Sequence, residues 1–431
     1  MTHVVLDRPT SPRTQGLLRR VTTRHTALLG GTTTWGDCLA GLSCLVTPGQ
    51  LLQGPAITEY EQTFARRIGV RFAYSFAHGR VGLYGLLRAL EVGPGDEVML
   101  QVPTHIVVPN AIRYTGARPI YVDCQLDTYN MDLEQARRLI TPRTKALILQ
   151  HTFGIPADLD AALALARAHG LHVIEDCVHA LGSTYDGRQV GSFGCAAFFS
   201  TEETKTISTT MGGMVVTDHP ELAERMQAFQ AQCAWPSPRL VARYISKLMV
   251  YQTLTHPRLH RYTRAVYEAF GRRHPLPRPT SAAEVLGARP THYEKRLSNA
   301  QAVVGLRQLH RLDANLAHRR AIAEVYATEL SRAGFYLPHP PTKAQPAFLR
   351  CPVWVEDRTA ALRATVRCAI LGTWFTSVLE EAVSPVCGDY ELGSCPRAEA
   401  VAQHLVNLPT HPRVSPDHAA KIVAALASIR P

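Results

Sequence analysis

Val173-Ile-Glu-Asp-Cys-Val-His-Ala-Leu-Gly-Ser183 is the stretch of this sequence that decides the fold. Its first residues are apolar and β-branched, which is typical of a buried strand, and Glu175 and Asp176 end that strand. In open α/β sheets, ligands bind beyond the carboxyl ends of the strands. The sequence therefore places Asp176 where a ligand would be contacted.

The sequence around this stretch alternates short apolar runs with segments of helical periodicity, from about residue 55 to 230. Strands are expected near 97–100, 119–123, 146–150, 171–175, 196–200 and 213–217. Helices are expected near 58–67, 81–90 and 159–169. This alternation predicts an α/β fold with a mostly parallel sheet that is covered by helices on both faces.

A reactive lysine is expected downstream, at Lys205. It follows the predicted strand Ala196-Ala-Phe-Phe-Ser200, and no carboxylate separates it from Gly213. A lysine among small and hydroxyl side chains is easily desolvated, which lowers its pKa and lets the neutral amine attack a carbonyl. An isolated loop lysine is usually solvent-exposed, so this interpretation depends on the surrounding motifs.

Taken in order, these motifs resemble the DegT/StrS family of sugar aminotransferases, which are fold-type I enzymes that depend on pyridoxal phosphate (PLP). The resemblance covers roughly residues 50–230 and 290–425. Further matching segments are Gly93-Pro-Gly-Asp-Glu-Val98, Gly191-Ser-Phe-Gly194 and Asn407-Leu-Pro-Thr-His-Pro412. Each match is weak alone, but their order and spacing are specific. The resemblance implies a large PLP-binding domain with a mostly parallel sheet and a smaller C-terminal α/β domain.

The resemblance also implies a role for each matching residue. Lys205 would hold the cofactor as a Schiff base and move the proton at the substrate carbon. Asp176 would keep the pyridine nitrogen protonated, so that the ring withdraws electrons. His179 would contact the ring oxygen and His105 would stack on the ring. Three further residues would hold the phosphate: Gly79, Arg80 and Ser200.

Three positions depart from the family pattern. Arg80 replaces a small hydroxyl residue, and its guanidinium could hold the phosphate through two hydrogen bonds. Thr210-Met211 replaces Gly-Glu, which changes the expected substrate contacts. Glu294 replaces an Asn that reaches the phosphate of the neighbouring subunit. Either Lys295 or Arg296 serves instead, or that contact is absent.

The expected domains are an N-terminal segment (1–54) packing with the small domain, a PLP-binding domain (55–300) and a small C-terminal domain (301–431). A basic helical insertion at about 234–290 interrupts the large domain. Residues 239–278 hold nine Lys or Arg and the single acid Glu268. Amphipathic helices are expected near 240–249 and 259–270, followed by a proline-rich segment at 274–279. A solvated hairpin, a subunit contact, an anionic substrate, an acidic partner or a membrane surface would each explain the insertion, and the core chemistry does not require it.

Composition limits the partners and the compartment. The net charge of +11 comes without an RNA-binding motif or zinc-finger spacing, so nucleic acid is not expected. The ten cysteines form no Cys-x-x-Cys pair, which favours reduced thiols without a metal site. The N-terminus lacks a signal-like segment, and no apolar run is long enough for a membrane span. A cytoplasmic protein is therefore expected.

The leading hypothesis is transfer of an amino group from an amino acid, glutamate or glutamine, to a keto-sugar. That acceptor would be nucleotide-linked or cyclitol-like, and the family implies a homodimer. One alternative is a PLP-dependent dehydratase or lyase acting on a deoxysugar. In such dehydratases a His replaces the lysine, so Lys205 favours transamination. Another alternative is a non-catalytic regulatory protein with a PLP-enzyme fold.

Overall fold

A computed structural model describes residues 25–28, 31–270 and 280–429. The proline-rich segment at 274–279 and three of the basic residues of the insertion, Arg272, Arg273 and Arg278, lie outside these ranges. No described helix is both long and apolar enough to cross a bilayer.

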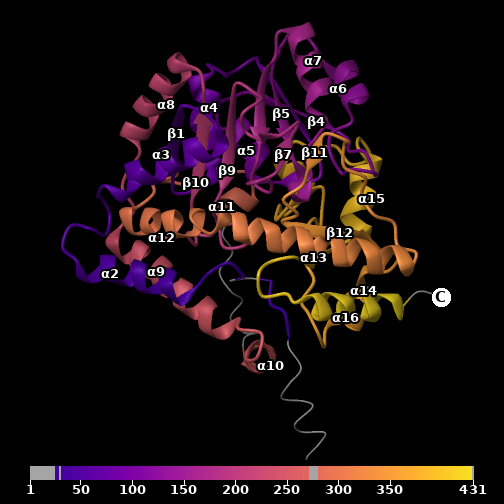
Figure 1. Cartoon of the computed structure of the whole chain (residues 1–431). Helices are drawn as coiled ribbons and strands as arrows, with labels where there is room; N and C mark the ends of the chain where they lie inside the picture. Colours follow the sequence, from indigo (N-terminus) through magenta and orange to yellow (C-terminus); the bar gives the residue numbers. More distant parts are fainter. Residues whose placement is uncertain (1–24, 29–30, 271–279, 430–431) are drawn as a thin grey trace, which may run out of the picture.

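The centre of the molecule is a seven-stranded sheet in the order β1-β10-β9-β6-β5-β2-β4 (Figure 1). Five strands, from β9 to β4 in that order, pair in parallel, whereas β10 runs antiparallel to both of its neighbours. The strands span Phe72–Phe76 (β1), Gly213–Thr217 (β10), Ala196–Ser200 (β9), His172–Asp176 (β6), Thr144–Gln150 (β5), Glu97–Gln101 (β2) and Arg118–Val122 (β4). This arrangement confirms the predicted α/β class.

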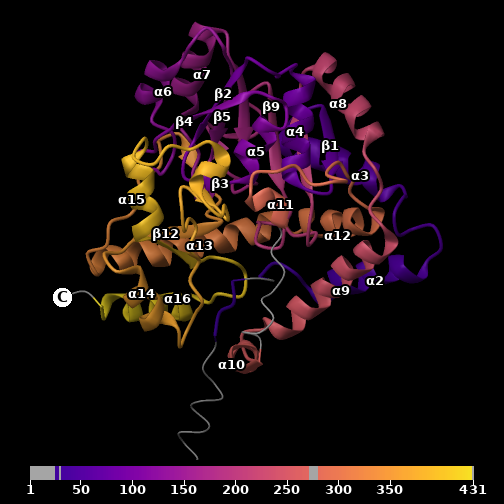
Figure 2. The ribbon, with the colours of Figure 1, turned by 180° about the vertical axis from the view of Figure 1, so that it is seen from behind.

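Helices cover both faces of the sheet (Figures 1 and 2). One apolar core includes residues from α3 (Ala56–Ile68), α6 (Leu133–Leu139), α7 (Leu159–His169) and α12 (Asn299–Leu309). The core on the opposite face includes residues from α4 (Gly79–Ala89), α5 (Val107–Arg113) and α8 (Pro220–Gln232). The strands are therefore buried on both sides, which explains why they read as almost continuous apolar runs.

A separate apolar core lies in the C-terminal part of the chain. It is formed by α13 (Leu312–Arg332), β12 (Arg350–Trp354), α14 (Arg358–Thr365), β14 (Leu405–Pro409) and α16 (Pro416–Ala427). Another short strand from this part, β13 (Leu379–Glu380), pairs in parallel with β3 (Thr104–His105). This pairing brings C-terminal residues next to His105, one of the predicted cofactor contacts.

The N-terminal segment and the insertion pack on each other. Helix α2 (Trp35–Val46) lies against α9 (Pro238–Leu254) and α12, and Cys38, Val241 and Val304 share one apolar cluster. Thr26 also pairs with Ala369 of the C-terminal part, so the segment contacts both parts of the chain. The division into domains stays a prediction.

The described part of the insertion is helical, as the sequence predicts. Helix α9 extends beyond the expected range 240–249, because Ser237 caps its start and Pro238 occupies its first turn. Helix α10 spans His260–Phe270, and the short helix α11 spans Ala282–Val285.

Candidate active site

A cavity of about 280 Å³ lies beyond the carboxyl ends of β6 and β9. Seven of its lining residues are those that the sequence analysis selected: Gly79, Arg80, His105, Asp176, His179, Ser200 and Lys205. They come from positions more than a hundred residues apart in the sequence. The fold therefore brings the whole predicted set into one site.

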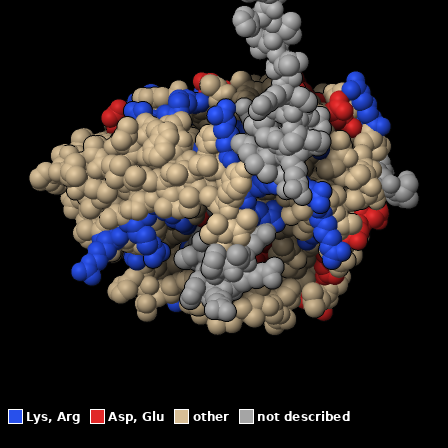
Figure 3. Space-filling view, turned by 90° about the horizontal axis from the view of Figure 1, so that it is seen from below, with Lys and Arg blue, Asp and Glu red and all other residues tan. Residues whose placement is uncertain are grey.

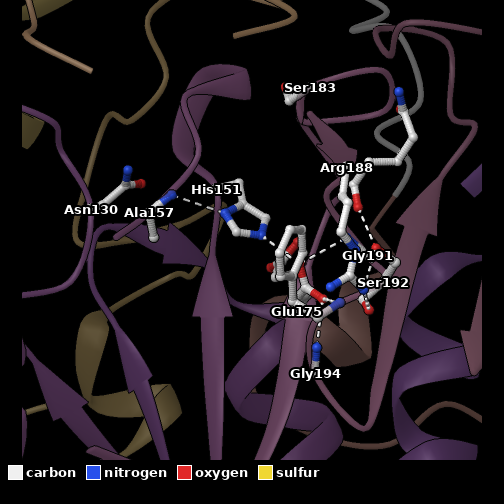
Figure 4. Close-up of polar contacts among 12 residues, drawn as sticks. Asn130, His151, Ala157, Glu175, Ser183, Arg188, Gly191, Ser192 and Gly194 are labelled. Carbon is white, nitrogen blue, oxygen red and sulfur yellow. Dashed lines mark hydrogen bonds and ion pairs between the residues drawn. The ribbon is translucent and has the colours of Figure 1, made fainter. Parts of the chain in front are cut away.

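The two acids at the end of β6 have different roles: Glu175 binds backbone groups, and Asp176 faces the cavity. Glu175 accepts hydrogen bonds from the backbone N–H groups of Gly191, Phe193 and Gly194 at 2.7, 2.7 and 2.8 Å. Its carboxylate also lies 3.2 Å from Nε2 of His151 (Figure 4). Because successive side chains of a strand alternate in direction, Asp176 is free to face the cavity. Glu175 thus fixes the segment 191–194, which precedes β9.

Asp176 is a buried carboxylate with little internal compensation. One oxygen accepts a hydrogen bond from the Val178 N–H at 3.1 Å. Burial raises the pKa of Asp176 to about 6, against the opposing effects of that hydrogen bond and of the charge of Lys205. A cationic group in the cavity would stabilise the ionised form. The protonated pyridine nitrogen of PLP is such a group, so this residue fits the cofactor.

Lys205 faces the same cavity from the loop after β9. Desolvation lowers the pKa of its amine to about 8, although the charge of Glu202 acts in the opposite direction. A sizeable fraction of the amine is therefore neutral near neutral pH, as nucleophilic attack on an aldehyde requires. The Nζ atom lies 4.2 Å from the centre of the Trp374 ring.

His179 is held between two aromatic rings. It stacks on Trp374 with ring centres 4.9 Å apart and on Phe153 at 6.1 Å. Burial holds the pKa of His179 well below its ordinary value, so the ring is neutral. Its Nδ1 accepts a hydrogen bond from the Phe153 N–H at 3.4 Å, which leaves the proton on Nε2. A neutral imidazole with a free Nε2–H can donate to a ring oxygen.

The start of α4 forms an anion-binding corner. The helix has no side-chain cap at His78, and its first residue is Gly79. A Cβ at Gly79 would lie 2.9 Å from the carbonyl oxygen of Phe199, and a Cβ at Gly213 only 2.2 Å from the Gly79 nitrogen. Both glycines thus let the helix start approach the strands beside Ser200. Backbone N–H groups at such a helix start suit a phosphate.

The structure changes the interpretation of Arg80. Its Nε lies 2.7 Å from a carboxylate oxygen of Glu284, and both side chains are largely buried. Glu284 belongs to α11 of the insertion, where its other oxygen accepts hydrogen bonds from Ser281. The sequence suggested a phosphate as the partner of this guanidinium. It missed Glu284, because the two residues are about two hundred positions apart.

His105 lies at the rim of the cavity and is only half-buried. Its Nδ1 accepts a hydrogen bond from the Val107 N–H at 3.3 Å, and its Nε2 lies 3.4 Å from Glu381. The pairing of β3 with β13 therefore sets the orientation of this ring.

The insertion contacts the loop that carries Lys205, although the core chemistry does not require its basic residues. Lys247 of α9 lies 2.6 Å from a carboxylate oxygen of Glu203, two residues before Lys205. The hydroxyl of Tyr251 donates to the same carboxylate at 2.7 Å. These contacts arise because α9 packs beside the loop that carries the lysine, where the Thr210 hydroxyl donates to the Tyr244 carbonyl.

Sequence reasoning missed four further residues at the site: Glu202, Arg350, Trp374 and Glu380. Glu202 and Glu380 line the cavity together with Trp374. Arg350 had one recognisable signal, because it interrupts the apolar run Ala347 to Val355 of a buried strand. Charged residues are seldom fully buried without a partner.

The strand order, the helix start facing Ser200 and the buried lysine define a fold-type I PLP-dependent enzyme. The model of the DegT/DnrJ/EryC1/StrS aminotransferase family matches residues 39–427. The chain therefore belongs to this family of PLP-dependent aminotransferases.

Similar proteins span almost the full length of the chain. GDP-perosamine synthase from Caulobacter vibrioides is 30% identical over 393 residues, which are 90% of this chain and 94% of that protein. UDP-N-acetyl-3-dehydro-alpha-D-glucosamine 3-aminotransferase from Acidithiobacillus ferrooxidans is 29% identical over 90% of this chain and 93% of its own length. The crystal structure of S. venezuelae DesV in complex with a ketimine intermediate is 28% identical, with a TM-score of 0.72 and coverages of 91% and 94%.

Proposed function

We propose that this aminotransferase moves an amino group from an amino acid, glutamate or glutamine, to a keto-sugar that is nucleotide-linked or cyclitol-like. One observation carries the proposal: Lys205, with a lowered pKa, shares a cavity with the buried Asp176. The similar proteins named above support a sugar as the acceptor, because their names include a perosamine synthase and a dehydro-glucosamine aminotransferase.

We assign a task in this reaction to each of the seven lining residues that the sequence selects. PLP, when bound, supplies an electron-withdrawing ring that stabilises negative charge on the substrate carbon. Lys205 would hold the cofactor covalently and would supply the amine that moves the proton at that carbon. Asp176 would pair with the ring nitrogen, and His179 would donate from Nε2 to the ring oxygen. His105 would stack on the ring, and Gly79, the Arg80 backbone and Ser200 would bind the phosphate.

A lyase reaction and a regulatory role remain the competing functions. The presence of Lys205 favours transamination over both, because a His replaces this lysine in the deoxysugar dehydratases and a regulatory role needs no reactive amine. A half-reaction separates the three directly. Purified protein loaded with PLP is mixed with L-glutamate or L-glutamine, and its visible absorbance is followed. Conversion of the cofactor to its amine form, with release of a keto acid, supports transamination. An unchanged spectrum with every amino acid tested contradicts it. A panel of nucleotide-linked keto-sugars and keto-cyclitols then identifies the acceptor.

We also propose that the enzyme works as a homodimer in the cytoplasm. In this structure Glu294 forms an ion pair with Arg289. That pairing offsets the negative charge that would otherwise repel a phosphate of the neighbouring subunit. The replacement of the family's Asn at this position is therefore compatible with a shared site.

We further propose a peripheral contact between the insertion and an anionic membrane surface. Several exposed apolar side chains lie on α2 and from the end of α9 to α10: Trp35, Leu39, Val46, Leu254, Leu259, Tyr262 and Val266. Viewed from below, one side of the molecule has a broad area without charged side chains, and Lys and Arg lie along its edges (Figure 3). Apolar area next to basic residues suits an anionic lipid surface.

A further inference from the structure

Arg350 is a buried cation without a hydrogen-bond partner in the described part of the chain. The residue is 3% exposed, and its Nη1 and Nη2 atoms are both buried and unpaired. No carboxylate of a described residue lies within 4.0 Å of it. A buried charge without a partner is strongly unfavourable, so we expect an anion to bind to this guanidinium.

The guanidinium lies next to the reactive lysine. Its central carbon is 3.9 Å from the centre of the Trp374 ring, and the same ring lies 4.2 Å from Nζ of Lys205. Stacking occupies the flat face of a guanidinium and leaves its N–H groups free in the plane. A small cavity of about 20 Å³ is lined by both Lys205 and Arg350. A cavity of this size has room for about one water-sized group, such as a carboxylate oxygen.

The surrounding residues hold the Arg350 guanidinium and the Trp374 ring in place. A Cβ at position 372 would lie 2.5 Å from Nη1 of Arg350, so Gly372 leaves the space that the guanidinium needs. Asn407 accepts a hydrogen bond from the Trp374 N–H at 3.0 Å and pairs with the backbone of Gly372. Asn407 is the first residue of the segment 407–412. This segment therefore helps to position Trp374 and Gly372, in addition to packing in the C-terminal apolar core.

The charge of Arg350 persists under working conditions. Burial lowers the pKa of its guanidinium to about 10, while the charges of Glu202 and Glu380 act against that shift. Arg350 is therefore protonated at neutral pH. Arg80, which lines the larger cavity, is already paired with Glu284.

We propose that Arg350 binds the α-carboxylate of the amino-acid donor. The inference rests on the proposed function, in which the donor is an amino acid. The α-carboxylate is bonded to the same carbon as the reacting nitrogen, so it must lie within a few ångströms of the place where Lys205 reacts. The keto-sugar acceptor has no such carboxylate. Arg350 thus selects the donor and leaves the acceptor half-reaction almost unaffected.

The test compares two reagents that both react with the bound cofactor but differ in a carboxylate. Aminooxyacetate carries one, and O-methylhydroxylamine does not. Each is mixed with wild-type holoenzyme and with the Arg350→Gln, Arg350→Lys and Arg320→Gln variants, and the visible absorbance is followed. Arg320 is the control, because it donates to the carbonyls of Gly182 and Pro346 and lines neither cavity. The same variants are mixed with L-glutamate and L-glutamine.

Loss of a charged, two-point hydrogen bond predicts about a 100-fold lower second-order rate with aminooxyacetate and with the amino acids in Arg350→Gln. Arg350→Lys should recover part of this loss, and Arg320→Gln should behave as wild type. The rate with O-methylhydroxylamine should stay within about threefold, which also shows that the variant is folded and loaded. Equal losses with both reagents would overturn the inference.

The two proposals fail in different ways. If wild type accepts an amino acid and Arg350→Gln does so equally well, the assignment of Arg350 is wrong and the donor class stands. If wild type accepts no amino acid, the proposed function is wrong. The preference for aminooxyacetate over O-methylhydroxylamine then still decides whether Arg350 binds a carboxylate.

Discussion

Asp176 and Lys205 face each other across one cavity with pKa values that burial shifts toward each other. Burial disfavours the charged form of both groups. Each group would be stabilised by the cofactor that the family uses: Asp176 by a cationic ring nitrogen, and Lys205 by forming a covalent bond as the neutral amine. Binding of the cofactor would therefore offset the free-energy cost of burying these two groups.

Replacing Asp176 by Asn should retain much of the PLP binding but lower turnover by several orders of magnitude. The neutral amide cannot keep the ring nitrogen protonated, so the ring withdraws electrons poorly. The cofactor content and the amino-donor half-reaction of the variant are measured together. A variant that binds PLP and turns over at nearly the wild-type rate would remove Asp176 from the mechanism.

The rate of PLP attachment to the apoenzyme should rise with pH and level off above about 8. Only the neutral amine of Lys205 reacts, and its fraction increases as the pH passes the lowered pKa of about 8. Absorbance after rapid mixing with PLP, between pH 6.5 and 9.5, gives the profile. A midpoint near the ordinary lysine value would show that Lys205 is not desolvated in the apoenzyme.

At the scale of single elements, the helix starts and the insertion show what sequence can predict. The expected helix at 81–90 begins at Gly79 in the structure, because two glycines allow it to approach β9 and β10 closely. The insertion was predicted as helices with one basic side, and α9 and α10 confirm the helices. The contacts of Lys247 with Glu203 could not be predicted, since they depend on how α9 packs.

Binding of the insertion to anionic vesicles should be lost when Arg258 and Arg261 are both changed to Glu. These residues lie at the junction of α9 and α10, next to exposed apolar side chains, and they line no part of the cofactor cavity. Co-sedimentation with vesicles that contain phosphatidylserine measures the effect. Binding by wild type should weaken with salt, since exposed charges are screened beyond about 8 Å at physiological ionic strength.

Two controls keep this vesicle test specific. Arg243 and Lys247 stay unchanged, because α9 contacts the lysine loop. Turnover and visible absorbance of the double variant should equal those of wild type. If wild type does not bind these vesicles at low salt, the insertion does not serve an anionic membrane.

At the scale of the whole molecule, the sequence predicted the sheet and one half of the site. Lys205, Asp176 and His179 lie within about thirty residues, in motifs whose order is informative. Arg350 and Trp374 come from the C-terminal part and reach Lys205 only through folding. Nothing local in the sequence connects residue 374 to residue 205, so this half required the structure.

A homodimer should be the active species in solution. The family's fold implies that the sites lie between subunits, and the charge of Glu294 is already paired within its own chain. Light scattering of the holoenzyme at the concentration of the activity assay gives the mass. A fully active species with the mass of one 47.5 kDa chain would contradict the proposal.

The most direct test of the account is to locate the cofactor on the chain. The protein loaded with PLP is reduced with borohydride, digested and mapped by mass spectrometry. The account predicts that the reduced cofactor is found on Lys205, and that Lys205→Ala, loaded in parallel, retains no covalently fixed cofactor and almost no turnover. A label on another lysine, or a variant that still fixes PLP and transfers amino groups, would contradict it.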